Sequence, residues 1–204
     1  MSSPRISFGA IALLLLGSAV AFAQQEPSAP ANPVNLDFEA GADQRGLPVG
    51  WIGGAPGYDM AWDPTVAHQG EASGKIARHA GTTEKTSPAS LSQWISAERW
   101  RGKRVRLSGW LRTQDISSGW AGLWMRVDSP TTPALAFDNM QKRGLHGTSD
   151  WAKYEVVLDV PKVASDIYFG AMLTGDGIVW ADDVALEEVP LSVPTTTLPQ
   201  TGKP

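Results

Sequence analysis

Aromatic and charged side chains are the residues of this 204-residue chain best suited to bind a ligand. A flat indole ring can stack on the apolar face of a sugar while nearby polar groups bind its hydroxyls. Because tryptophan is also highly buried on average, several of these rings are expected to lie in a core instead. The nine tryptophans are Trp51, Trp62, Trp94, Trp100, Trp110, Trp120, Trp124, Trp151 and Trp180.

Two stretches combine aromatic and basic side chains in a regular pattern. In residues 103–113 and 120–127 these side chains alternate with apolar ones, which is the period-two pattern of half-buried strands. If the two strands pair, their aromatic and basic faces form one surface with a stacking platform and charged donors. Alternation does not say which face is inward, so this face could instead be a second layer of core with arginines at its edges. The face carries Trp110, Arg112, Trp120, Trp124 and Arg126.

Asp138 and Asn139 add a carboxylate and an amide close to the same strands. Both side chains could bind sugar hydroxyls. The alternative is that they shape a turn by bonding to nearby backbone, as these residue types commonly do.

Catalysis has little support in the sequence, and the chain is predicted not to be an enzyme. It has three histidines, His68, His79 and His146, and no H-E-x-x-H spacing for a metal. It has no cysteine, no G-x-S-x-G elbow and no phosphate-binding glycine loop. A net charge of −4 does not favour nucleic acid, whose phosphates require a basic patch.

These candidate residues must be positioned mainly by strands, because no segment shows a sustained helical period. Several short strands separated by turn signals are typical of a sandwich or barrel. We therefore predict an all-β fold, an antiparallel two-sheet jelly-roll β-sandwich. The expected strands are residues 103–113, 120–127, 154–160, 166–173 and 178–186, with weaker ones at 35–39, 57–62, 73–78 and 90–95.

The organisation along the chain predicts export. Residues 1–23 combine Arg5, an apolar run and an A-x-A site ending at Ala23, which is typical of a secretory signal peptide. An uncleaved anchor is the alternative, but the run is short for a membrane span. A linker at 24–33, one domain at 34–189 and a disordered tail at 190–204 follow. We expect a periplasmic or extracellular protein with no membrane association after cleavage, and assign no role to the sortase-like LPQTG at 198–202.

Several motifs resemble those of galactose-binding-like jelly rolls, a group that includes many carbohydrate-binding modules. They are NLDFE at 35–39, GLPVGW at 46–51, HQGEAS at 68–73, WRGKRVRLSGW at 100–110 and VWADDVAL at 179–186. The stretch WAGLWMRVD at 120–128 resembles a narrower bacterial subgroup, found alone or beside regulator or peptidase domains. The resemblance covers residues 34–189 and is more specific for fold than for function.

The resemblance also implies one structural calcium ion between the first and last strands. Glu39 matches the glutamate of the first strand, and Asp182 and Asp183 match the aspartate pair of the last. Calcium requires six to eight oxygen ligands, including carbonyls that a sequence does not reveal, so these carboxylates could instead be exposed strand residues. We expect a secreted, non-catalytic module that binds carbohydrate or cell-wall glycan by tryptophan stacking. The alternative is a protein-interaction domain whose tryptophans lie mainly in the core.

Overall fold

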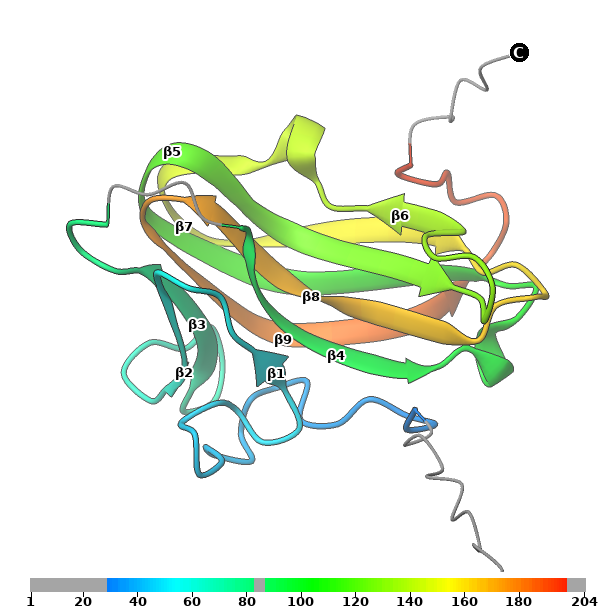
Figure 1. Ribbon diagram of the computed structural model, residues 1–204, viewed down its shortest axis with the longest axis horizontal. Helices are drawn as coiled ribbons and strands as arrows, with labels where there is room; N and C mark the ends of the chain where they lie inside the picture. The colour runs from blue at the N-terminus through cyan, green and yellow to red at the C-terminus, as the bar shows by residue number, and fades with distance from the viewer. Residues whose placement is uncertain (1–28, 83–86, 198–204) are drawn as a thin grey trace, which may run out of the picture.

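The computed structural model describes residues 29–82 and 87–197 (Figure 1). Where apolar and polar side chains alternate, the backbone is extended and the strands pair antiparallel. No helix within the described ranges is long and apolar enough to cross a membrane. The elements are β1 (Ile52–Gly53), β2 (Tyr58–Asp63), β3 (Ser73–Arg78), β4 (Ala89–Ser96), β5 (Arg104–Asp128), β6 (Ala136–Asp138), β7 (Leu145–Asp159), β8 (Asp166–Gly175) and β9 (Ile178–Val189), with 3-10 helices at Glu98–Trp100 and Gln141–Arg143.

Strand β5 belongs to both layers of the molecule. Its first part, residues 104–114, pairs with β9 and β7, whereas residues 119–128 pair with β8 and β6. Because β5 passes from one layer to the other, all nine strands belong to one hydrogen-bonded sheet, in which β1-β4-β8-β5-β9-β3-β2 form a continuous path and β6 and β7 each branch from β5. We call β2, β3, β9, the first part of β5 and β7 the first layer. The second layer is β1, β4, β8, the second part of β5 and β6.

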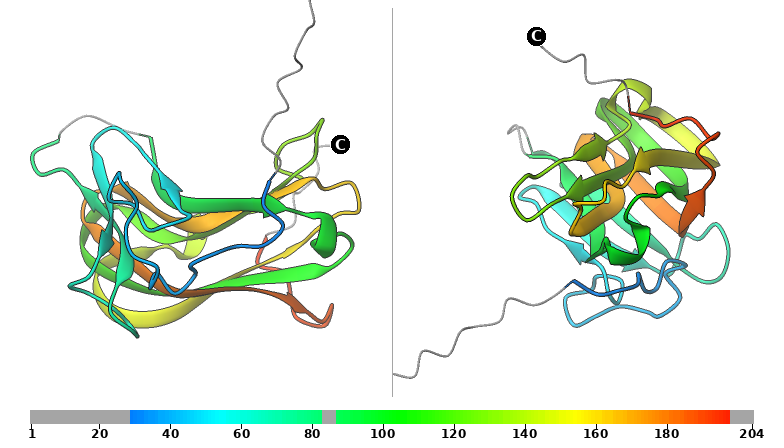
Figure 2. Two further views of the ribbon diagram at one scale, coloured as in Figure 1. Left: turned by 90° about the horizontal axis from the view of Figure 1, so that it is seen from below. Right: turned by 90° about the vertical axis from the view of Figure 1, so that its right-hand side faces the viewer.

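The inner faces of the two layers form one core. Figure 2 shows the two layers facing each other. Leu107 and Leu111 of the first layer are fully buried, as are Leu123 and Met125 of the second. A Cβ added at Gly109 would lie 3.5 Å from Leu123 Cδ2, so the two parts of β5 face each other across this core. The predicted two-sheet antiparallel sandwich is confirmed, and the apolar face of both parts of β5 is the inward one, a choice that alternation alone left open.

Residues 35–39 differ from the prediction, because they form turns and no strand. Asn35 and Phe38 have left-handed backbone conformations, with φ of 49° and 61°. The Asn35 side-chain oxygen accepts a hydrogen bond from the Ala40 N–H at 2.9 Å. Asparagine tolerates the left-handed region and bonds to nearby backbone, which favours a turn over an extended segment.

The segment after β9 also differs from the prediction of a disordered tail. The Arg104 guanidinium donates hydrogen bonds to the carbonyls of Leu191 and Val193, at 2.8 and 2.6 Å. The Thr196 N–H donates to the Val157 carbonyl at 2.9 Å. Residues 190–197 are therefore packed against the first layer. Residues 198–204, the predicted signal peptide and the first half of the predicted linker, residues 24–28, lie outside the described residues.

Candidate functional site

The outer face of the second layer carries an aromatic row that crosses four strands. Trp94 of β4 is paired with Tyr168 of β8, and Tyr168 is paired with Arg126 of β5. Phe137 of β6 is paired with Arg126 and continues the row. Directly opposite residues in antiparallel strands project from the same face, so these four side chains are neighbours. We call them the aromatic row.

A second row beside it has small residues at its centre. Ile52 is paired with Ser92, Ser92 with Gly170, and Gly170 with Trp124. A Cβ at Gly170 would overlap the carbonyl oxygen of Leu91, so this position requires glycine. The small residues leave a low floor between the larger side chains.

A hollow of about 190 Å³ opens on this floor. Ser92 Oγ donates a hydrogen bond to Ser90 Oγ at 3.0 Å, so the Ser90 O–H can donate to a ligand. Ile52 forms an apolar wall of the hollow. We call this feature the serine hollow; it is lined by Ile52, Gly53, Gly54, Ser90 and Ser92.

The charge on this face is largely compensated. Arg126 Nη2 and Nε lie 2.8 and 3.1 Å from Asp128 Oδ2, and the guanidinium carbon lies 4.8 Å from the centre of the Tyr168 ring. Burial raises the pKa of the Tyr168 phenol, and the carboxylates of Asp166 and Asp128 raise it further. The phenol therefore stays protonated at neutral pH and can donate a hydrogen bond. A face with these properties suits a neutral, hydroxyl-rich ligand better than a polyanion.

Trp124 and Trp120, both predicted site residues, lie on this layer in different surroundings. Trp124 is half-buried in the second row, and its buried indole N–H has no acceptor within the part of the chain that the structure describes. Trp120 lies four residues earlier in β5, where its ring packs beside Gly122 and Gly144. The Trp120 backbone N–H donates to Thr174 Oγ1 at 2.9 Å. Trp124 is therefore the better placed of the two to contact a ligand beside the aromatic row.

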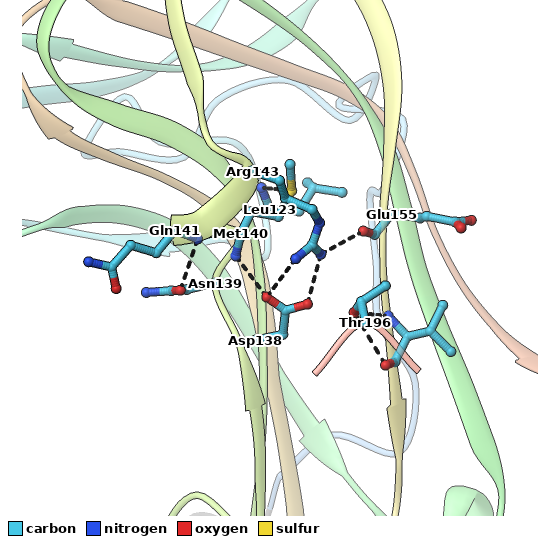
Figure 3. A network of polar contacts seen from close by, with 9 residues as sticks. Leu123, Asp138, Asn139, Met140, Gln141, Arg143, Glu155 and Thr196 are labelled. Carbon is cyan, nitrogen blue, oxygen red and sulfur yellow. Dashed lines mark hydrogen bonds and ion pairs between the residues drawn. The ribbon is translucent and has the colours of Figure 1, made fainter. Parts of the chain in front are cut away.

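Asp138 and Asn139 shape the turn after β6, as the alternative interpretation states (Figure 3). Both Asp138 carboxylate oxygens accept hydrogen bonds from Arg143, at 3.0 and 2.7 Å, and one also accepts the Met140 N–H. Asn139 Oδ1 accepts the Gln141 N–H at 3.2 Å. Burial alone would raise the pKa of Asp138, but the Arg143 guanidinium, the Thr196 side chain and the Met140 N–H together outweigh it and lower the pKa below its ordinary value. The acceptor groups of both residues are engaged within the protein.

Trp110 and Arg112 lie on the opposite side of the molecule, on the outer face of the first layer. Residues 103–113 pair with β7 and β9, not with 120–127. The Trp110 ring is stacked against His68, with ring centres 3.9 Å apart. The Arg112 guanidinium lies 5.6 Å from the Trp180 ring centre. The prediction of one surface joining Trp110 and Arg112 to Trp120, Trp124 and Arg126 is therefore wrong.

The three predicted calcium ligands converge on the segment 68–72. Glu39 Oε1 and Asp182 Oδ2 each accept two backbone N–H bonds from it, at 2.8 to 3.2 Å. Asp183 Oδ2 lies 2.7 Å from the His68 Nδ1. Burial raises the pKa of Asp182, although its N–H partners oppose this shift. Within residues 29–82 and 87–197, no group of three or more His, Cys, Asp or Glu is arranged to hold a metal ion. Calcium binding stays a prediction.

Trp94, Tyr168, Ser90 and Ser92 were not predicted as site residues. The signal for them was present, because alternation in residues 90–95 and 166–173 places them opposite buried Leu91, Ile95 and Phe169. Alternation does not reveal which strands are neighbours. The pairing of β8 with both β4 and β5 brings these residues together.

Comparison with known proteins identifies one long sequence match. The chain is 41% identical over 157 residues to the uncharacterized HTH-type transcriptional regulator YbfP of Bacillus subtilis strain 168. The match covers 76% of this chain and 52% of YbfP, so the chain spans about half the length of this curated relative. No protein-family model matches the chain.

Solved structures share the fold at low sequence identity. The xylan-binding CBM22-1 domain of Paenibacillus barcinonensis Xyn10C superposes with a TM-score of 0.53 and 18% identity, covering 79% of this chain and 98% of that domain. The enzymatically active domain of bacteriophage CBA120 tailspike protein 4 gives a TM-score of 0.53 at 14% identity, covering 78% and 22% of the respective chains. The sandwich is thus a jelly roll of the kind found in carbohydrate-binding modules.

Proposed function

We propose that the chain is a non-catalytic carbohydrate-binding module that binds glycan on the outer face of the second layer. The observation that carries this proposal is the aromatic row beside the serine hollow. Trp94 and Tyr168 offer ring area for the apolar face of a sugar, and Ser90 and Arg126 offer donors for its hydroxyls. Compensated charge and small residues on the floor agree with a neutral glycan as ligand.

The comparisons support a role in recognition. A xylan-binding domain shares this fold, and a similar sequence makes up about half of a protein named as a transcriptional regulator. A regulator requires a part that reads a signal, and a ligand-binding domain can supply it.

We also propose that this chain acts in the periplasm or outside the cell, as its predicted signal peptide indicates. Mass spectrometry of the exported protein should find an N-terminus at Gln24. An intact N-terminus on exported or membrane-bound protein would contradict cleavage.

Calorimetric titration of the protein with glycans tests the binding site. The panel should contain xylo-, gluco- and galacto-oligosaccharides and peptidoglycan fragments. We expect Trp94→Ala and Trp124→Ala each to weaken binding of the recognised glycan about tenfold or more, because a tryptophan anchor commonly dominates a binding site. Circular dichroism should show that both variants remain folded.

Trp151→Ala is the matched control, since Trp151 is a partly buried tryptophan in β7 of the first layer. It should leave glycan affinity unchanged. Loss of binding in this variant, with Trp94→Ala unaffected, would move the site to the first layer. Absence of binding to every glycan would overturn the proposed function and favour the protein-interaction alternative.

A further inference from the structure

An apolar cavity lies next to the serine hollow, at the edge of the second layer. Its volume is about 400 Å³. Val34 and Ile52 in its wall remain 52% and 51% exposed. The cavity is lined by Pro30, Asn32, Val34, Gly50, Ile52, Gln93 and Trp94.

Gln93 and the side-chain oxygen of Asn32, two polar groups among these lining residues, are engaged within the protein. Gln93 Oε1 accepts the Val34 N–H at 3.1 Å, and Gln93 Nε2 donates to the Val34 carbonyl at 2.6 Å. The Asn32 side-chain oxygen accepts a hydrogen bond from Arg99. The remaining lining presents mostly carbon. A sugar in this cavity would bury hydroxyls with few partners, which costs about 1–3 kcal/mol for each unsatisfied group.

The cavity and the serine hollow share a wall. Ile52 lines both, and Ile52 is paired with Ser92, whose hydroxyl lies in the hollow. Trp94 lines the cavity and also begins the aromatic row. A single ligand can therefore place a polar part on the serine hollow and an apolar part in the cavity.

We propose that the ligand is an amphiphilic glycoside, whose sugar lies on the serine hollow and aromatic row and whose alkyl or aryl group fills the apolar cavity. This inference rests on the proposed function. The cavity volume lies within the usual range for small-molecule sites and exceeds what a short alkyl chain or one aromatic ring requires. Covering Val34 and Ile52 removes exposed apolar surface from water, which favours binding.

Paired glycosides of the same sugar test the proposal by calorimetry on the full chain. Methyl and hexyl β-glycosides of xylose, glucose and galactose should be used below their micelle concentrations. We expect the hexyl glycoside of the recognised sugar to bind about tenfold tighter than its methyl partner, since buried methylenes stabilise a complex. Val34→Ser should remove this advantage and leave methyl-glycoside affinity unchanged, because Val34 lines the cavity and not the serine hollow.

Val163→Ser is the matched control, since Val163 is 66% exposed and outside the cavity lining. It should preserve the advantage. Equal binding of methyl and hexyl glycosides, or an advantage that survives Val34→Ser, would overturn this inference while leaving the proposed function intact. Hexyl binding that does not depend on the sugar, and that hexanol reproduces, would overturn both. Sedimentation of a dimer that Val34→Ser converts to monomer would show that a second copy fills the cavity, and would also overturn the inference.

Discussion

His68 stacks on Trp110 with ring centres 3.9 Å apart and ring planes inclined by 15°. The same imidazole lies 2.7 Å from the Asp183 carboxylate, so it joins the segment between β2 and β3 to the first layer. We expect His68→Ala to lower the free energy of unfolding by about 1–3 kcal/mol, from the lost ring contact and the lost bond to a charged group. Urea unfolding followed by fluorescence measures this change.

Glycan affinity should not change in His68→Ala, because Trp110 lies on the layer opposite the aromatic row. His79→Ala is a suitable control for stability, since His79 pairs at 2.9 Å with the highly exposed Asp59. Exposed ion pairs contribute little, so this variant should unfold almost like the wild type. A larger loss in His79→Ala than in His68→Ala would contradict the stabilising role assigned to the stack.

Asp138→Asn should destabilise the protein in a pH-dependent way. The pKa of Asp138 lies below its ordinary value of 3.8, so this carboxylate stabilises the fold fully above about pH 4 and loses that effect as the pH falls through its lower folded pKa. We expect the variant to lose about 1.5–3 kcal/mol at pH 7, typical of hydrogen bonds to a charged group. The gap between wild type and variant should shrink below pH 4 in urea unfolding measured from pH 7 to 2.5.

Arg143→Met provides the complementary control for this ion pair, because Arg143 donates to both Asp138 oxygens. It should also destabilise at neutral pH, since it leaves a buried carboxylate without its main partner. A difference between wild type and Asp138→Asn that stays constant down to pH 2.5 would show that the carboxylate acts through its shape and not its charge.

Local alternation predicted which side chains share a face of each strand, but not which face is inward. Leu111 and Leu123 were placed on apolar faces opposite Trp110 and Trp124, and both leucines are fully buried. A periodicity of two residues shows which side chains of a single strand lie on the same face of the sheet. The fold class therefore followed from the sequence, whereas the outward direction of Trp124 was left open and is decided by the packing of the neighbouring Leu123 into the core.

The composition of the site could not be predicted in the same way, because it depends on which strands are neighbours. Residues 103–113 and 120–127 are close in sequence, but β5 carries them into different layers. Trp94 and Tyr168 are separated by more than seventy positions and yet are directly opposite each other. Asp138 bonds to Arg143 across a short turn, and its residue type alone is equally compatible with binding a sugar.

Calcium binding predicts a change in thermal stability that depends on Glu39. Glu39 and Asp182 both hold the segment 68–72 through its N–H groups, so an ion near them would stabilise the same segment. If the ion binds, calcium should raise the melting temperature by several degrees after treatment with chelator, by mass action on the folded state. Glu39→Gln should abolish the rise, whereas Glu98→Gln should preserve it. An unchanged melting temperature with calcium would leave these carboxylates with their role as backbone acceptors alone.

Residues 190–197 should protect the free edge of β7. The Val157 N–H donates to Thr196 Oγ1 at 2.9 Å and the Val157 carbonyl accepts the Thr196 N–H, so Thr196 occupies backbone groups that an unpaired strand would expose. We expect truncation after Val189 to lower the free energy of unfolding by at least about 1.5–3 kcal/mol, because Arg104 also loses two carbonyl partners. Light scattering should show faster aggregation, since strand edges without partners pair with other chains.

Single substitutions separate this edge protection from a general effect of shortening the chain. Thr196→Val removes the hydroxyl that accepts the Val157 N–H and should cost about 0.5–1.5 kcal/mol. Leu191→Ala should have little effect, because the Leu191 side chain is 70% exposed and its carbonyl, which accepts from Arg104, is retained. If truncation and Thr196→Val both unfold like the wild type and remain monodisperse, the segment contributes nothing to the edge, as the prediction of a disordered tail implies.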